Sequence, residues 1–172
     1  MNDVKLRAFT KEDAETLATL ANNIKIWNNI RDYVPNPYTL ADAEEFISRK
    51  LAEHPTLTFA IEYKGSLAGI MSLEPKTDVF RISSIVGCWI GEPYWGKGIA
   101  TAALEQLIKY AFEELKIIRL EAGHFDYNVA SGKVLEKCGF KRFAIAHKAA
   151  IKNGVILDDH IYELINPSHS SY

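Results

Sequence analysis

The residues best suited to chemistry lie in one short run that contains two glycines. Residues 94–101 read Tyr-Trp-Gly-Lys-Gly-Ile-Ala-Thr and stand between an apolar stretch and an amphipathic one. Gly96 and Gly98 allow the backbone to turn several N–H groups toward one point, and a helix beginning after them adds the positive end of its dipole. This pattern favours binding of a pyrophosphate. Taken alone, the two glycines are equally compatible with a tight turn between a strand and a helix.

Two other phosphate-binding motifs fit this run poorly. The nucleoside triphosphate loop G-x-x-x-x-G-K-[ST] has its lysine after the second glycine, whereas Lys97 precedes Gly98 and no Ser or Thr follows it directly. A dinucleotide fold needs a third Gly or Ala where this chain has Thr101, and it begins with a βαβ unit, not with antiparallel strands. Glu121 alone matches that motif, so a nucleotide-binding redox domain is the weakest of the functional hypotheses.

Apolar periodicity predicts the elements that hold the run in place. The strand before it is apolar on both alternating sets, which predicts a central strand covered on both faces. Gly65-Ser66 and Asn153-Gly154 are predicted hairpin turns. The order is that of an α+β fold: a single domain with a mixed, mostly antiparallel sheet of about seven strands and about four helices. The predicted strands are residues 4–9, 57–63, 67–73, 85–90, 119–125 and a final pair from Phe140 onward, and the helices are 14–24, 40–53, 100–115 and 130–137.

Capping residues predict where several helices begin and end. Thr10 with Asp13, and Thr39 with Asp42, have the spacing of capping boxes, and Gly139 is a natural C-cap. The apolar stripe of the first helix runs from Ala14 to Ile24 at spacings of three and four residues.

Composition limits the remaining possibilities. The chain has 172 residues, of which 48% are hydrophobic and 24% charged, and this predicts one domain over residues 1–166 with a frayed tail at 167–172. A net charge of -2 gives no basic field for nucleic acid, and no apolar run is long enough for a membrane span. Cys88 and Cys138 are predicted to be reduced core thiols, their spacing suggests no metal site, and we expect a cytoplasmic protein.

Residues 90–101 resemble the acetyl-CoA signature of the GNAT superfamily of N-acetyltransferases, [Gln/Arg]-x-x-Gly-x-[Gly/Ala]. Trp95, Gly98 and Ala100 occupy its three defined places, and the Trp-Gly-Lys-Gly form is similar to that of the branch of ribosomal-protein N-terminal acetyltransferases. A second block, Asn128 to Ser131 followed by residues 134–140, resembles the Asn-x-x-Ser and Glu-Lys-x-Gly-Phe block of the same branch. The resemblance extends over nearly the whole chain.

This resemblance implies acetyl-CoA as the donor and assigns residues to it. Backbone N–H groups of residues 96–101 would hold the pyrophosphate, and the strand ends at 89–90 and 122–125 would border the pantetheine arm. Asn128 and Ser131 would line that arm, although both residue types also favour helix capping. The implied coenzyme-binding residues are Trp89, Ile90, Trp95, Gly96, Lys97, Gly98, Ile99, Ala100, Thr101, Asn128, Ser131, Lys133 and Lys137.

The implied reaction is direct attack of a neutral amine on the thioester carbonyl, with a base to accept the ammonium proton and an acid for the departing thiolate. Many family members have a tyrosine acid where this chain has Leu135, so Ser131 is the candidate acid. Glu74 and Glu92, at predicted strand ends, are candidate bases, and each is also compatible with an ordinary solvated carboxylate. His124 is a further candidate, although a lone histidine in a strand is more often structural.

The acceptor is predicted to be a primary amine, either a protein N-terminus or a small molecule such as an amino acid, polyamine or antibiotic. The segment 27–38 combines aromatic and amide side chains with two prolines and is our candidate substrate wall, with Trp27, Tyr33, Tyr38 and His124 as candidate contacts. Packing of the aromatic residues onto the sheet is the alternative. A non-catalytic acyl-CoA sensor is the alternative function, and a monomer or homodimer is expected.

Overall fold

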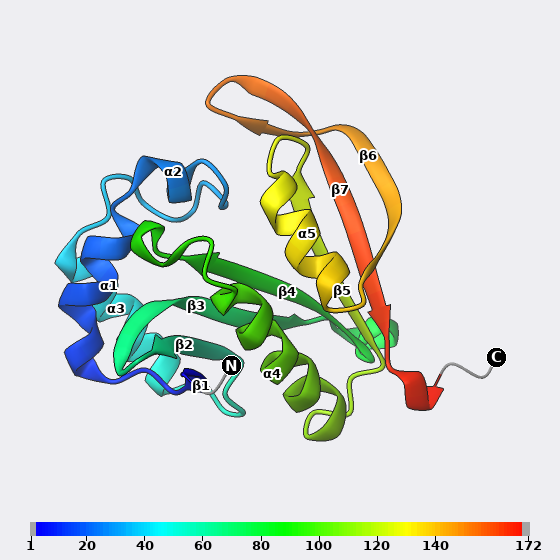
Figure 1. Cartoon of the computed structure of the whole chain (residues 1–172), viewed down its shortest axis with the longest axis horizontal. Coiled ribbons are helices and arrows are strands. Elements are labelled where there is room, and N and C mark those ends of the chain that lie inside the picture. The colour runs from blue at the N-terminus through cyan, green and yellow to red at the C-terminus, as the bar shows by residue number, and fades with distance from the viewer. Residues whose placement is uncertain (1–2, 170–172) are drawn as a thin grey trace. The chain divides into compact units, whose positions relative to one another are not determined.

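The computed structural model describes residues 3–169. The chain forms two compact units, one of the residues up to Ser72 together with Cys88–Ala103, the other of Leu73–Gly87 with the residues from Leu104 onward. Within the described residues there are seven strands, which are hydrogen-bonded in the order β1-β2-β3-β4-β5-β7-β6 (Figure 1). The strands are β1 Val4–Arg7, β2 Thr58–Tyr63, β3 Ser66–Pro75, β4 Ser83–Ile90, β5 Arg119–Phe125, β6 Lys141–Lys152 and β7 Val155–Ile165, and the helices are α1 Ala14–Ala21, α2 Ile24–Trp27, α3 Leu40–Leu51, α4 Ile99–Glu113 and α5 Val129–Lys137. The predicted α+β class and order of elements are confirmed, with one short helix more than expected.

In the first unit, β1, β2 and β3 form an antiparallel meander. Val4 pairs with Tyr63 and Thr58 pairs with Ser72, so the register brings alternate side chains to one common face. Gly65 has a φ of +80° in the β2–β3 turn, a backbone conformation that an L side chain rarely adopts. The predicted hairpin is therefore confirmed, with its glycine at the position that needs it.

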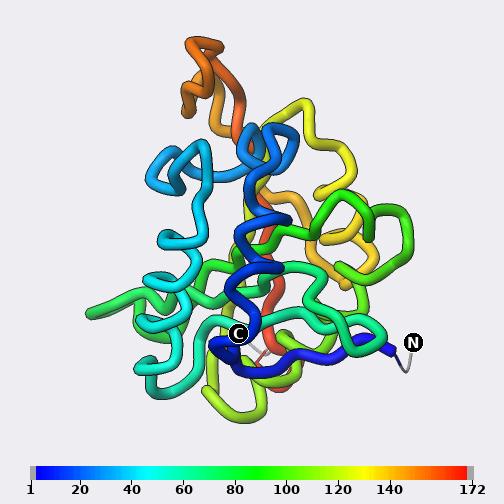
Figure 2. The backbone as a smooth tube through the Cα atoms, turned by 90° about the vertical axis from the view of Figure 1, so that its left-hand side faces the viewer, coloured from blue at the N-terminus to red at the C-terminus, as the bar shows by residue number. Residues whose placement is uncertain are grey.

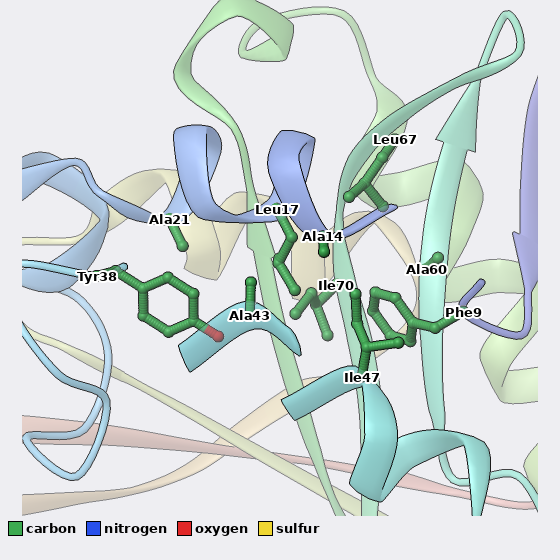
Figure 3. Packing of buried hydrophobic residues seen from close by; sticks show 10 residues of the cluster. All are labelled: Phe9, Ala14, Leu17, Ala21, Tyr38, Ala43, Ile47, Ala60, Leu67 and Ile70. Atoms are coloured by element: carbon green, nitrogen blue, oxygen red, sulfur yellow. The ribbon is translucent and has the colours of Figure 1, made fainter. Parts of the chain in front are cut away.

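Helices α1 and α3 pack on the apolar face of this meander (Figure 3). Leu17 of α1 is fully buried, and Ile47 of α3 is 2% exposed. Each such side chain contributes roughly 1.5–3 kcal/mol through its removal from water. Both predicted capping boxes are present: the Thr10 N–H donates to Asp13 and the Thr39 N–H to Asp42. The buried cluster consists of Phe9, Ala14, Leu17, Ala21, Tyr38, Ala43, Ile47, Ala60, Leu67 and Ile70.

The first helix is shorter than its apolar stripe predicts. Helix α1 ends at Ala21, and the side chain of Asn23 then accepts a hydrogen bond from the Lys25 N–H and begins the separate helix α2. Ile24, the last residue of the predicted stripe, is 53% exposed. Asn23 has extended backbone angles, which end one helix and cap the next. Figure 2 shows α1 in blue leading into the wide loop that contains α2.

In the second unit, β4 begins parallel to β5, which in turn pairs with β7. Ser83–Ile85 pair with Arg119–Glu121, and all seven residues of β5 pair antiparallel with β7. The β6–β7 hairpin turns at Asn153 and Gly154, whose φ angles of +51° and +77° are those of a tight hairpin turn. Pro167–His169 form a short 3-10 helix, and the last three residues of the predicted tail lie outside the described part of the chain.

Strand β4 is less covered than its apolar sequence predicts. Its residues from Ile85 onward are half-buried, apart from Cys88, which is exposed. The prediction of two core thiols is therefore wrong for Cys88, because its side chain is on the open face of the strand. Cys138 is half-buried, and burial raises its pKa to about 11, with a smaller contribution from Glu105.

Candidate functional site

The glycine run forms an exposed turn that leads into a helix. After β4, residues Glu92–Tyr94 form one 3-10 turn, and Gly96 and Gly98 follow with φ angles of +73° each. Helix α4 then begins at Ile99, and its first turn closes with a bond of 3.1 Å from the Ala102 N–H to the Gly98 oxygen. The first N–H groups of a helix have no acceptor within the helix, so this exposed end is suited to an anion.

Side chains of the loop hold its backbone in place. The indole N–H of Trp95 donates to the Ile90 oxygen over 2.6 Å, although the ring itself is 45% exposed. The Lys97 amine donates to the Pro93 oxygen over 2.8 Å and lies 5.6 Å from the centre of the Tyr94 ring. The lysine therefore turns back onto the loop, and its positive charge stays beside Pro93 and Tyr94.

The strand end that precedes the loop lies tightly against β3. A Cβ at Gly69 would come within 2.3 Å of the Trp89 oxygen, so this position admits no side chain. The Gly91 N–H donates to the Ala68 oxygen over 2.8 Å, and a Cβ at Gly91 would lie 2.8 Å from a methyl group of Leu20. At the other end Ile99 is 1% exposed and anchors the start of α4 in the core. Both ends of the loop are thus fixed while Gly96, Lys97 and Gly98 are exposed.

Glu92 is held by two residues from the segment around α2. Its carboxylate accepts from the Asn23 amide over 2.7 Å and forms an ion pair with the Lys25 amine. These hydrogen bonds, that from Lys25 first, lower the pKa of Glu92. Neither Asn23 nor Lys25 was among the residues that the sequence pointed to, and nothing in the local pattern links them to Glu92, which is 69 and 67 residues away respectively.

The three aromatic residues proposed for the substrate wall differ in exposure. Tyr38 is 9% exposed within the core cluster, and burial raises its pKa to about 12. Trp27 is half-buried, and its indole N–H donates to the Val34 oxygen over 2.9 Å. Tyr33 is 75% exposed. Tyr38 therefore has the packing role that was the alternative, while Tyr33 presents its ring to solvent.

In the second unit, Asn128 and Ser131 mark the start of α5. The Asn128 side chain accepts from the Ser131 N–H at 3.3 Å, which confirms its capping role, and its own N–H donates to the Phe125 oxygen at 2.8 Å. Ser131 is half-buried, and Lys133 and Lys137 are exposed on the same helix. Leu135 is 7% exposed and belongs to the core. Glu74, the other candidate base, is exposed near the end of β3.

His124 lies under α5 in a cluster with residues of β7. Its ring is 5.1 Å from that of His160 and 5.5 Å from that of Tyr162, and the residue is 8% exposed. Its Nδ1 is 2.8 Å from the Phe125 oxygen and must donate to it, while Nε2 has no hydrogen-bond partner among the described residues. Gly132 of α5 lies directly over Nε2. The environment of His124 is that of a packed ring, and no local sequence pattern predicts Gly132 or Tyr162 as its neighbours.

Two features are absent from the described part of the chain. Residues 3–169 contain no group of three or more His, Cys, Asp or Glu side chains arranged to hold a metal ion. Over the same residues, no helix has both the length and the apolar character to span a bilayer.

Comparison with known proteins identifies the family. Residues 3–141 match the family model "Acetyltransferase (GNAT) domain". The chain is 33% identical over 167 residues to "Putative ribosomal N-acetyltransferase YdaF" of Bacillus subtilis (strain 168), covering 94% of this chain and 91% of that protein. It is 40% identical over 85 residues to "Probable N-acetyltransferase YjcK" of the same strain, a match that spans 49% of this chain and 47% of YjcK.

Solved structures support the same assignment. The microcin C7 self-immunity acetyltransferase MccE, crystallised with acetyl-CoA and AMP, has a TM-score of 0.82 and 27% identity, covering 96% of this chain and 94% of that one. The match to YdaF agrees with the ribosomal-protein branch that the Trp-Gly-Lys-Gly run predicted. The exposed glycine turn at the start of α4 and the whole-length similarity lead to one conclusion: the chain belongs to the GNAT acetyltransferase family and is an acetyl-CoA-dependent N-acetyltransferase.

Proposed function

We propose that the chain acetylates the α-amine at the N-terminus of a polypeptide, in the cytoplasm and as a monomer or homodimer. The observation that carries this proposal is the similarity to YdaF, which covers 94% of the chain, including the residues of the substrate wall. YdaF is named a putative ribosomal N-acetyltransferase, and a polypeptide N-terminus is the acceptor that we propose on that basis. The cytoplasmic location and a single acetyltransferase domain over residues 1–166, both expected from the composition, are part of this proposal.

In this proposal the glycine loop binds acetyl-CoA, the acetyl donor. The start of α4 fits a pyrophosphate, because Gly96, Lys97 and Gly98 just before it are exposed and the helix N-terminus carries the positive end of the helix dipole. Bound acetyl-CoA supplies the thioester whose carbonyl the amine attacks. The chain contributes binding through residues 96–101, with Lys97 adding a positive charge beside the phosphates. Asn128, Ser131, Lys133 and Lys137 complete the proposed coenzyme contacts, together with Trp89, Ile90 and Trp95.

Proton transfers are assigned to two side chains. Ser131, a half-buried hydroxyl at the first turn of α5, is the proposed acid for the departing thiolate. Glu74 is the proposed base, acting directly or through water, because its carboxylate is exposed. Glu92 is not proposed as the base, since Lys25 and Asn23 stabilise its ionised form and lower its pKa.

A thiol-release assay with a matched acceptor panel tests the proposal. The panel contains a heptapeptide with a free N-terminus, the same peptide with a blocked N-terminus and one lysine, spermidine, and free amino acids. We expect kcat/KM for the free N-terminus to exceed every other value by at least about tenfold. A preference for spermidine or an amino acid would replace the polypeptide with a small-molecule acceptor. Tight binding of acetyl-CoA without turnover on any amine would favour the alternative function, a non-catalytic acyl-CoA sensor.

A further inference from the structure

Glu92 contacts both the glycine loop, residues 94–101, which we call the donor loop, and the segment just before the substrate wall of residues 27–38. One carboxylate oxygen accepts from the Asn23 amide at 2.7 Å, and the other is paired with the Lys25 amine. The backbone oxygen of Glu92 accepts from the Trp95 N–H at 3.2 Å, one residue before Gly96. A single residue thus contacts the α2 segment through its side chain and the glycine loop through its main chain.

Asn23 connects this contact to the substrate wall. Its side-chain nitrogen donates to Glu92, while its side-chain oxygen accepts from the Lys25 N–H and caps α2. Its backbone oxygen accepts from the Trp27 N–H at 2.9 Å. Trp27 in turn donates to Val34 within the wall. Displacement of Glu92 therefore changes the start of α2 and, through it, the segment 27–38.

The position of Glu92 is itself fixed by its neighbour. At Gly91 a Cβ would lie 2.8 Å from Leu20 of α1, and the Gly91 N–H is bonded to Ala68 of β3. The main chain beside Glu92 is thus packed between a helix and a strand. Two charge-assisted hydrogen bonds to a carboxylate on such a base orient the start of α2.

We infer that Glu92 is a positioning residue: it fixes the acceptor segment 23–38 to the donor loop, so that it controls the KM of the acceptor and takes no proton from the amine. This assignment rests on the proposed role of residues 27–38 as the acceptor wall. It differs from the role of general base that its place at the strand end suggested. Because the pair connects to the donor loop, binding of the coenzyme is also transmitted to the acceptor segment.

Kinetics of matched variants test this role. Glu92→Ala removes both contacts, Glu92→Gln keeps an acceptor oxygen for Asn23, and Lys25→Glu with Glu92→Lys reverses the pair. Glu45→Gln, which removes an exposed ion pair of α3, is the control. We expect Glu92→Ala to raise the acceptor KM about five- to twentyfold with kcat within about threefold, Glu92→Gln to lie between, and the reversed pair to recover part of the loss, because it restores the ion pair but leaves the Asn23 amide without its acceptor at position 92. The acid limb of the pH–rate profile stays in place in all of them.

Two results would overturn the inference. One is a fall in kcat of two orders of magnitude or more in Glu92→Gln together with loss of the acid limb, which is the behaviour of a general base. The other is an acceptor KM that does not change in Glu92→Ala. The assay uses whichever amine the wild-type protein acetylates best, so the failure of the polypeptide proposal does not affect its outcome.

Amide hydrogen exchange tests the same role of Glu92 without any acceptor amine. In the wild-type protein, saturating CoA is expected to slow amide exchange in residues 24–34, and in Glu92→Ala this protection is lost while protection of residues 96–102 remains. Equal protection of residues 24–34 in both proteins would show that the donor loop does not communicate through Glu92.

Discussion

Gly132 of α5 packs directly against His124 of β5: a Cβ at position 132 would lie 2.7 Å from Nε2 of the ring. The same Cβ would be 3.0 Å from the Tyr162 hydroxyl, which itself donates to Glu136 at 3.3 Å. The absence of a side chain at one helical position thus sets how closely α5 approaches β5 and β7. Ser131, the proposed acid, is the adjacent residue, so its position depends on this contact.

Gly132→Ala is therefore expected to destabilise the protein, although alanine favours helix more than glycine does. The clash costs about 1–3 kcal/mol, and the gain in helix propensity offsets about 1 kcal/mol of it. Urea denaturation measures the net loss in the free energy of unfolding. In the double variant with His124→Ala the ring is gone, and most of the added cost of the alanine should vanish, because only the tight approach to the Tyr162 hydroxyl remains. A Gly132→Ala cost that is the same with and without the His124 ring would contradict the packing contact.

Gly96→Ala should weaken acetyl-CoA binding while leaving the stability of the fold nearly unchanged. Nothing lies within 4 Å of a Cβ at this position, so the cost comes from the φ of +73° and amounts to roughly 1–2 kcal/mol. The loop relieves this strain by moving its N–H groups away from the phosphates. We expect the Kd for acetyl-CoA, measured by calorimetry, to rise about tenfold.

Gly65→Ala is the matched control for Gly96→Ala. Gly65 also has a positive φ, +80°, and open space around its Cβ position, but it lies in the β2–β3 turn. The same backbone strain at this turn should lower stability without changing the Kd for acetyl-CoA. If both variants bind acetyl-CoA equally well, the glycine loop is not the pyrophosphate site.

Asp13 should make the stability of the protein depend on pH in the acid range. Burial raises its pKa, but hydrogen bonds from Arg7, at 2.7 and 2.8 Å, and from Thr10 outweigh burial and lower the pKa overall. A carboxyl group whose pKa is lowered by folding stabilises the protein above its unfolded pKa, and this contribution is lost as the pH falls through the folded value. The loss therefore occurs below about pH 4.

Asp13→Asn is expected to cost about 1–3 kcal/mol at pH 7 and progressively less as the pH falls toward 2.5, since the wild-type carboxyl is then protonated too. Urea denaturation across this range gives the difference. Asp42→Asn is the control, because Asp42 forms the second capping box with Thr39 and no arginine is bonded to it in the described structure. A pH-independent difference between Asp13→Asn and the wild type would rule out the ionised carboxylate as the source.

Iodoacetamide should distinguish the two cysteines. Cys88 is exposed, whereas Cys138 is half-buried with a pKa of about 11, so well under 1% of Cys138 is thiolate at pH 7.5. Mass spectrometry is expected to find rapid modification of Cys88 and none of Cys138 on the same time scale. The Cys88→Ser variant should stay unmodified until urea unfolds it. Early modification of Cys138 would mean that its thiol is more accessible than the structure has it.

Local sequence signals predicted most of the fold because they act within a few residues. The bounds of β5, the turn at Asn153-Gly154 and the two capping boxes depend on neighbouring side chains and on backbone preference. The end of α1 was missed because Asn23 stops the helix, although the apolar stripe continues to Ile24. A competing cap ended the helix that hydrophobic spacing alone would extend.

The candidate site was only partly predictable, since its contacts join distant parts of the chain. The glycine run is local, and the sequence identified it. The pairing of Glu92 with Lys25 and the packing of Gly132 on His124 arise from the fold and have no local signature. Burial of Tyr38 likewise depends on the cluster formed by α1 and α3. Aromatic residues in a loop gave no means of distinguishing core from rim.

The bond from the Trp95 indole to the Ile90 oxygen has a consequence for the thermodynamics of coenzyme binding. This hydrogen bond closes a loop of the chain from Ile90 to Trp95. The hydrogen bond from the Lys97 amine to the Pro93 oxygen closes a second loop, from Pro93 to Lys97, which overlaps the first. The main chain that receives the pyrophosphate is thus ordered when the protein folds, and little conformational entropy remains to be lost when the ligand arrives. Preorganisation of this kind improves affinity without adding a single contact to the ligand.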